Sequence, residues 1–174
     1  MKKYLIKFCA VILCLCCIFG MTSCNDEQGD EKSYEVAGLH FTLPSNLPEL
    51  KVSYADVCYG NSDVQFFANI FAREELSEEL EISEDITVED YTYKFIYVWN
   101  GYSCTYDYDE ETNVATFSLF YPEEEGTDEE REYYYHYITR TEGALFVVIM
   151  CCEERVYDTY APLFEEWAKT IYVE

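Results

Sequence analysis

The sequence predicts an α+β fold, in which a mainly antiparallel β-sheet of about six to seven strands packs with two amphipathic helices. Three observations support this prediction. Short segments of alternating apolar and polar residues are separated by turn residues, which is typical of antiparallel strands. Two longer stretches repeat their apolar residues every three or four positions, as amphipathic helices do. One segment, residues 144–152, is apolar throughout, which indicates a central strand covered on both faces.

The first expected elements are strands. Residues 39–43 have strand character and end at Pro44. Residues 52–59 form a second segment, which the glycine-containing run 60–63 ends. Residues 64–70 form a third, since apolar side chains alternate there with more polar ones.

A helix is expected to begin at Thr87, whose hydroxyl is suited to capping a helix and which precedes acidic residues in the first turn. Tyr91, Phe95 and Val98 would share its buried face. The helix should end at Gly101, since glycine tolerates a left-handed backbone.

A hairpin follows, with strands 102–108 and 115–119 around a turn at 109–113. An acidic loop at 122–130 separates it from a tyrosine-rich strand, 132–140, which turns into the apolar strand 144–152. The last element is expected to be a helix with Pro162 in its first turn, where a missing N–H costs little. Its apolar residues recur with helical spacing: Tyr160, Leu163, Phe164, Trp167, Ala168 and Ile171.

Residues 1–23 have the three regions of a secretory signal peptide, with lysines at the start and an apolar run from 8 to 19. Their ending, Thr22-Ser23 before Cys24, resembles that of a bacterial lipoprotein signal. The resemblance implies that Cys24 is lipidated and becomes the mature N-terminus, so that the membrane is a partner through a covalent lipid such as palmitate. A transmembrane anchor is disfavoured, because Lys7 shortens the run below the roughly 20 apolar residues that a span needs.

Residues 24–36 are then expected to be the lipidated cysteine and an acidic tether, and residues 37–174 a single globular domain. The stretch Asn25-Asp26-Glu27 resembles the tether that directs some Gram-negative lipoproteins to the outside of the outer membrane. It is equally well explained as a solvated linker. The expected location is the cell envelope, and more narrowly the outer membrane, on its periplasmic or outer side.

The charge of the chain excludes one class of partner. There are 11 Lys and Arg against 35 Asp and Glu, and three of the lysines lie in the leader, so the mature part has a net charge of −27. Binding to nucleic acid needs clustered Lys and Arg, and is therefore not expected. Disorder is not expected either, because aromatic residues make up 18% of the chain.

Four cysteines remain in the mature domain: Cys58, Cys104, Cys151 and Cys152. An exported protein can pair them in disulfides in three ways, and they can equally be small apolar residues of strands. Cys151 and Cys152 are neighbours on a strand, so we expect no disulfide between them. No cysteine and histidine spacing predicts a zinc site, and no cofactor is expected.

The run 133–137 contains four tyrosines and His136. On a strand, Tyr134 and His136 share one face, and we expect them to be the exposed pair available to a ligand. Tyr135 and its neighbours two positions away would face the core. An exposed aromatic surface could bind a glycan or a peptide. The alternative is a cross-strand ladder of packed rings under a helix.

The sequence gives little support for a metal site or for an enzyme active site. The acidic turn around Asp109 lacks the spacing and the glycine of a calcium loop, so no metal site is expected. No nucleophile elbow, phosphate-binding glycine loop or zinc motif predicts an enzyme. A carboxylate-based hydrolase remains a less favoured alternative, and it would need a deep pocket with two buried carboxylates.

Three short segments carry a family resemblance. Residues 38–44 look like the opening strand of PsbP-like domains, residues 86–91 resemble the first helix start of that group and of the DcrB-like lipoproteins, and residues 160–164 match their closing helix. The resemblance covers residues 38–172 in element order, and the chain departs from it by its acidity and its adjacent cysteines. It implies an α/β sandwich that binds or assembles and does not catalyse. No functional residue carries over. A surface module that binds glycans through the tyrosine-rich strand is the alternative.

Overall fold

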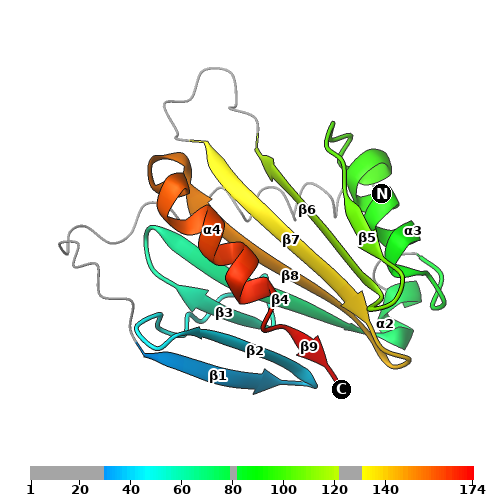
Figure 1. The fold of residues 1–174 in the computed structure, drawn as a ribbon. Helices are drawn as coiled ribbons and strands as arrows, with labels where there is room; N and C mark the ends of the chain where they lie inside the picture. The colour runs from blue at the N-terminus through cyan, green and yellow to red at the C-terminus, as the bar shows by residue number, and fades with distance from the viewer. Residues whose placement is uncertain (1–29, 79–81, 122–130) are drawn as a thin grey trace.

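The structure is a computed structural model that describes residues 30–78, 82–121 and 131–174. The leader, Cys24 and the acidic loop 122–130 lie outside the described residues. The main element is a six-stranded antiparallel sheet (Figure 1). Its strands lie in the order β3 (Val57–Gly60), β4 (Val64–Ala72), β8 (Ala144–Glu153), β7 (Glu132–Arg140), β6 (Val114–Phe120) and β5 (Asp107–Asp109). The α+β class and the mainly antiparallel sheet are therefore confirmed.

A second, three-stranded sheet was not expected. It consists of β1 (Glu31–Val36), β2 (Leu39–Pro44) and β9 (Tyr172–Val173), in the order β1-β2-β9. Strand β1 occupies residues that we assigned to the acidic tether. It is held there by its hairpin with β2, whose two turn residues, Ala37 and Gly38, have φ angles of 49° and 83°.

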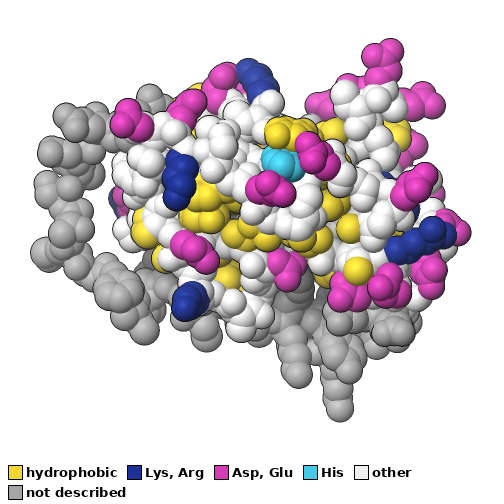
Figure 2. Space-filling view, turned by 90° about the horizontal axis from the view of Figure 1, so that it is seen from below, with side chains coloured by type: hydrophobic (Ala, Val, Ile, Leu, Met, Phe, Trp, Pro, Cys, Tyr) yellow, Lys and Arg dark blue, Asp and Glu magenta, His cyan; other side chains and the backbone are white. Residues whose placement is uncertain are grey.

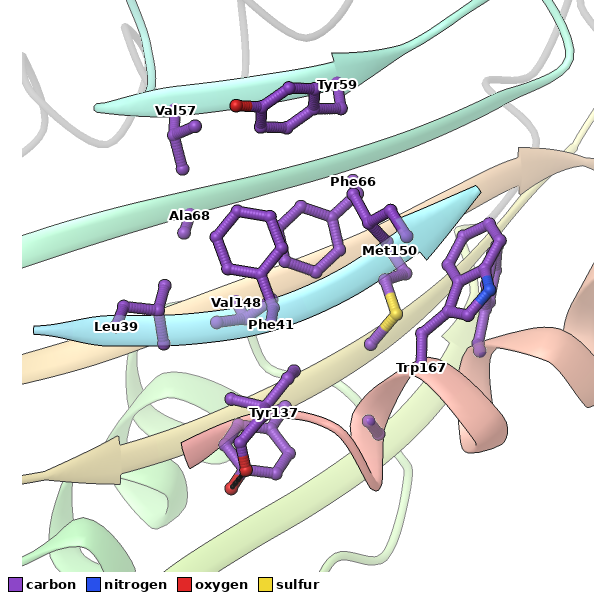
Figure 3. Close-up of a cluster of buried hydrophobic side chains, with 14 of the residues drawn as sticks. Leu39, Phe41, Val57, Tyr59, Phe66, Ala68, Tyr137, Val148, Met150 and Trp167 are labelled. Atoms are coloured by element: carbon purple, nitrogen blue, oxygen red, sulfur yellow. Dashed lines mark hydrogen bonds between the residues drawn. The ribbon is translucent and has the colours of Figure 1, made fainter. Parts of the chain in front are cut away.

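The small sheet and α4 (Tyr157–Ala168) cover one face of the large sheet, which we call the α4 face. Figure 3 shows the core between these layers. Phe41 of β2 stacks on Phe66 of β4 with ring centroids 4.5 Å apart, and Phe164 and Trp167 of α4 are buried in the same cluster. The interlocking rings of two sheets and one helix thus form a single apolar layer.

Helix α4 begins earlier than predicted. A short 3₁₀ turn, η2 (Glu154–Val156), leads directly into it, so Pro162 lies in its second turn. There proline removes the hydrogen bond to the carbonyl of Asp158. Both residues are exposed, so water can take the place of the missing donor.

Figure 2 shows the molecule from below, where acidic side chains surround a band of hydrophobic ones and few Lys or Arg side chains lie among them.

The opposite, α3 face of the large sheet is covered by α2 (Arg73–Glu78), α3 (Val88–Tyr93) and the π-helix η1 (Lys94–Trp99). Thr87 caps α3 as predicted, since its hydroxyl accepts from the amide of Asp90 at 3.0 Å. Tyr91 and Phe95 are buried, but Val98 is 63% exposed. The wider turn of a π-helix rotates later residues out of the buried face, which the α-helical spacing could not predict.

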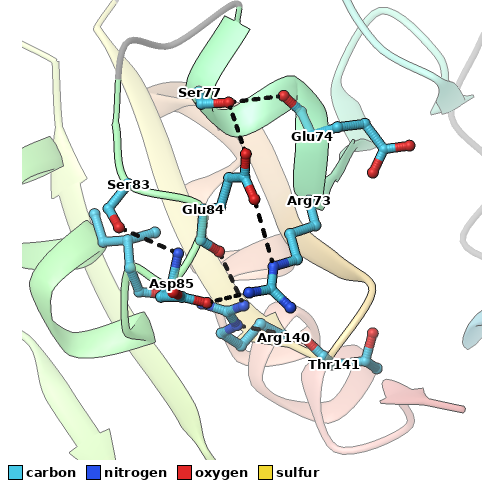
Figure 4. Close-up of polar contacts among 9 residues, drawn as sticks. Arg73, Glu74, Ser77, Ser83, Glu84, Asp85, Arg140 and Thr141 are labelled. Carbon is cyan, nitrogen blue, oxygen red and sulfur yellow. Dashed lines mark hydrogen bonds and ion pairs between the residues drawn. The ribbon is translucent and has the colours of Figure 1, made fainter.

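The segment before α3 is fixed by two arginines (Figure 4). Arg73 forms ion pairs with Glu84 and Asp85, and Arg140 of β7 donates to the carbonyls of Ile86 and Glu84. These contacts hold the start of α3 against the sheet.

The central position of β8 is confirmed, because eight of its ten residues are buried in succession. Cys151 belongs to the cluster on the α3 face and Cys152 to that on the α4 face, so the two side chains point to opposite sides as predicted. None of the four described cysteines is in a disulfide. Burial raises the pKa of Cys58 to about 11 and that of Cys152 to about 12, since the thiolate is poorly solvated there.

Candidate functional site

The prediction that Tyr134 and His136 are exposed on the tyrosine-rich strand is wrong. Tyr134 is 3% exposed and His136 is 1% exposed. The ring of His136 stacks on Phe117 with centroids 4.2 Å apart, and the ring of Phe95 lies at 5.5 Å. Side chains of η1 and β6 thus close this face, and no ligand can reach either residue.

Both residues are packed into the core and do not form part of a site. The hydroxyl of Tyr134 donates to a carboxylate oxygen of Glu132 at 2.5 Å, and its ring packs edge-on against Tyr121. Burial lowers the pKa of His136 to about 3, so the imidazole is neutral at pH 7. Its Nδ1 has no hydrogen-bond partner in the structure.

The polar side chains on this strand face were misleading for a physical reason. His136 and Arg140 share this face of the strand, and two such polar side chains suggest solvent access. Arg140 instead reaches past the sheet to main-chain carbonyls (Figure 4), and His136 is packed among rings as an aromatic residue would be. The alternative of a packed ladder of rings describes this face correctly.

The other face of the same strand contributes to an open groove. On the α4 face, helix α4 and the small sheet cover β3, β4, β8 and part of β7 (Figure 1). Helix α4 also reaches the end of β6, where the rings of Tyr157 and Phe120 lie 5.1 Å apart. β5 and the middle of β6 are left open. A cavity of about 730 Å³ lies there. We call it the edge groove, and it is lined by Tyr97, residues 103–105, Asp107, residues 116–118, Tyr135 and Glu165.

The edge groove continues along α4. A second cavity of about 510 Å³ shares Asp107, Thr116, Tyr135 and Glu165 with the first and extends to Lys169. Tyr135 is half-buried between the two. It was predicted to be a core residue, and it packs against the core of the α4 face but also lines the groove.

Carboxylates determine the electrostatics of the groove. Asp107 and Glu165 are both exposed. Partial burial and then the charge of Glu165 raise the pKa of the Tyr135 hydroxyl, although a hydrogen bond with the Thr116 side chain opposes the shift. Lys169 is paired with Glu166, with 2.7 Å between the charged atoms. The groove is therefore a negatively charged surface around an aromatic ring.

The rim on the α3 face is formed by η1. Tyr97 is 39% exposed, and its hydroxyl donates to the carbonyl of Cys104 at 2.8 Å. The ring of Tyr93 lies 5.1 Å from that of Tyr97. Burial and then the charge of Glu89 raise the pKa of the Tyr106 hydroxyl, and Tyr97 adds to the shift. π-Helical turns are often found at functional sites, and the sequence alone could not show that η1 is one.

In the acidic turn after β5, the Asp109 carboxylate binds backbone amides of the turn itself. Asp109 accepts from the amides of Glu111 and Thr112 at 2.9 and 3.4 Å. Asn113 has a φ of 54°, which closes the hairpin where it was predicted. No group of three possible metal ligands occurs among the described residues.

Comparisons with known proteins give the fold. No protein-family model matches the chain, and no curated protein matches it in sequence. The cyanobacterial PsbP (CyanoP) from Synechocystis sp. PCC 6803 is similar in structure, with a TM-score of 0.54 and 16% identity over 88% of this chain and 99% of that one. The Ran-binding protein Mog1p from Saccharomyces cerevisiae has a TM-score of 0.52 and 10% identity, over 83% and 96% of the two chains.

These similarities confirm the PsbP-like fold that the short motifs suggested. At such identities they establish the arrangement of elements and no ligand. Within residues 30–78, 82–121 and 131–174, no helix has the length and hydrophobicity to cross a bilayer. The chain thus has a PsbP-like α+β fold with an open hollow, the edge groove, beside β6 and β5.

Proposed function

We propose that this chain is a lipid-anchored protein of the cell envelope whose domain binds a partner in the edge groove and catalyses no reaction. The observation that supports the proposal most is the character of the groove. It is open, and its carboxylates, Asp107 and Glu165, are both exposed. A carboxylate hydrolase would need one acid buried enough to hold its proton at neutral pH, so the groove favours binding over hydrolysis.

The fold neighbours are consistent with this proposal. The yeast neighbour is a Ran-binding protein, so a domain of this fold binds a protein there. The same use of the fold is proposed here with a different partner, because function depends on the site and not on the fold.

The anchor part of the proposal rests on the leader and Cys24. Lipidation would hold the domain at the membrane without any contribution from surface charge, because the acidic surface repels anionic lipid. Metabolic labelling with a fatty-acid probe tests it: the wild-type protein should be labelled and the Cys24→Ser protein should not. Equal labelling of both would show that the anchor is wrong.

The groove part is tested by site-specific photo-crosslinking in intact cells. A photoreactive phenylalanine analogue replaces Tyr135 in the groove or Tyr172, which is 54% exposed on β9. We expect a discrete cross-linked species from position 135 and not from position 172. Cross-links from neither position, or the same species from both, would exclude the groove as the binding site.

A glycan is the second candidate for the ligand. The observation that favours it is the half-buried ring of Tyr135 beside the hydroxyls of Thr116 and Ser118, since sugars bind to aromatic faces flanked by hydrogen-bonding groups. Titration with oligosaccharides should then shift the signals of groove residues, and Tyr135→Ala should abolish the shifts. Shifts that persist in Tyr135→Ala would place any sugar elsewhere.

A further inference from the structure

Strand β6 has an unpaired edge next to the groove. On one side, β6 pairs with β7 along the whole length of β6, up to Phe120 opposite Tyr133. β5 pairs with it at three positions, from Val114 to Thr116. Within the part of the chain that the structure describes, no strand pairs with residues 118–120 on the β5 side.

The unpaired backbone groups can be assigned to particular residues. The amide of Tyr121 donates to the carbonyl of Glu132 in β7 at 3.0 Å. Backbone groups alternate in direction along a strand, so those of Ser118 and Phe120 point away from β7 and toward the open side. Among the described residues nothing binds these two N–H groups and two carbonyls, so another strand can pair with them.

The chain segment that could have closed this edge is held elsewhere. Residues 102–106 continue β5 toward its N-terminal side, yet they do not pair with β6. The hydroxyl of Tyr97 binds the carbonyl of Cys104, and the amide of Tyr102 donates to the carbonyl of Ile96 at 2.8 Å. Both contacts fix the segment to η1, and the space of about 730 Å³ lies between it and β6.

We propose that an extended, basic segment of a partner protein adds to β6 as an antiparallel strand, through the backbone of Ser118 and Phe120. The inference rests on the proposed binding function of the edge groove and names the class of partner. Strand addition to an open sheet edge provides main-chain hydrogen bonds, and side chains alternate between the two faces of the sheet.

Charge determines which side chains the added strand carries. In an antiparallel pair, the residue opposite Ser118 lies on the α4 face, where Tyr135 and Glu165 line the groove. A Lys or Arg there can pair with the carboxylates of Glu165 and Asp107 and lie against the ring of Tyr135. Its neighbours on the α3 face would meet Tyr97 and Phe117, which suits apolar side chains. The expected segment alternates basic and apolar residues.

The same charge disfavours this chain's own acidic segments as occupants. Residues 25–28 contain two acids, and residues 122–130 contain six acids without a Lys or Arg. Repulsion from Asp107 and Glu165 opposes their binding in the groove.

The test uses the full mature protein in detergent and the capped hexapeptide of alternating lysine and valine. Calorimetry should show binding by this peptide and at least tenfold weaker binding by its glutamate–valine counterpart. Two N-methylated peptides provide matched controls, one methylated at the lysine amides and the other at the valine amides. In an antiparallel pair the lysine amides face β6, so methylation there should weaken binding at least tenfold and methylation of the valines should not.

Protein variants test the same contact from the other side. Ser118→Pro removes an N–H on the open side and should abolish binding, whereas Ser118→Ala keeps that N–H and should bind as the wild type does. Glu165→Lys should weaken binding of the lysine peptide at least tenfold. If Ser118→Pro does not fold, the methylated peptides still decide.

Each outcome bears on the proposal. Equal binding by both methylated peptides would overturn strand addition and leave a groove that binds basic side chains. Binding by none of the peptides, in a protein that cross-links through position 135, would overturn the inference and leave the proposed function standing. Absence of that cross-link would instead contradict the proposed function.

Discussion

His136 lies between Phe95 and Phe117, and this surrounding keeps its imidazole neutral at pH 7. Its folded-state pKa of about 3 is below the ordinary value of 6.5, so the unfolded chain binds the proton more readily. The stability that depends on neutral His136 is fully present above pH 6.5. It is lost as the pH falls from 6.5 toward 3.

We therefore expect His136→Phe to change the pH dependence of stability. Between pH 7 and pH 5 the wild type should lose about 2 kcal/mol more of its unfolding free energy than the variant, from the ordinary histidine pKa and the lowered one. At pH 7 the variant should be as stable or more stable, because it removes a buried nitrogen that has no partner. Urea unfolding at both pH values measures these free energies. An equal loss of unfolding free energy in the two proteins between pH 7 and pH 5 would contradict the prediction.

The two neighbouring tyrosines of β7 should differ in their contribution to stability. Tyr134 is 3% exposed, whereas Tyr135 is half-buried at the groove. Removing a large buried ring costs about 3–5 kcal/mol, so Tyr134→Ala should destabilise by that order and Tyr135→Ala by clearly less. Urea midpoints compare them directly, and the reverse order would mean that the register of β7 is shifted by one residue.

At the scale of elements, periodicity predicted the strands and helices that are regular along their own length. The predicted bounds of β7, 132–140, were correct. The central position of β8 was also correct, because a strand buried on both faces is apolar at nearly every position. β1 was missed since Glu31, Lys32 and Ser33 are exposed and read as a tether. β9 has two residues and exists through its pairing with β2.

The candidate site was less predictable than the fold. Alternation correctly divided Tyr134 and His136 from Tyr135, but it could not tell which set α3 and η1 would cover. The groove depends on where α4 and the small sheet stop, and on a π-helix that holds residues 102–106 away from β6. These are tertiary features, and no local residue pattern encodes them.

The hairpin between β1 and β2 offers a test of an element. Ala37 has a φ of 49°, a left-handed conformation that costs a residue with a Cβ about 1 kcal/mol. Asn is favoured at this position before glycine in a two-residue turn, so Ala37→Asn should raise the unfolding free energy by about that amount. Ala37→Val, which puts a β-branched residue there, should lower it. Equal stability of the two variants would mean that the turn is not formed.

At the scale of the whole molecule, a thin sandwich carries a large charge of one sign. The whole chain has a net charge of −24, and acidic side chains spread over the face seen in Figure 2. Ion pairs between exposed side chains, such as Arg73 with Glu84 and Lys169 with Glu166, contribute little each. Repulsion among the remaining carboxylates therefore opposes the compact state more than these pairs support it.

Screening should then stabilise the protein. Raising sodium chloride from about 10 mM to about 500 mM shortens the Debye length from about 30 Å to a few Å and weakens the repulsion between distant surface charges. We expect the melting temperature to rise by several degrees, since about 1 kcal/mol corresponds to roughly 2–4 °C for a domain of this size. Choline chloride is the control: an equal rise with both salts assigns the effect to screening, because a bound sodium ion would act with the first salt alone. A melting temperature that falls as salt is added would mean that the exposed ion pairs outweigh the repulsion.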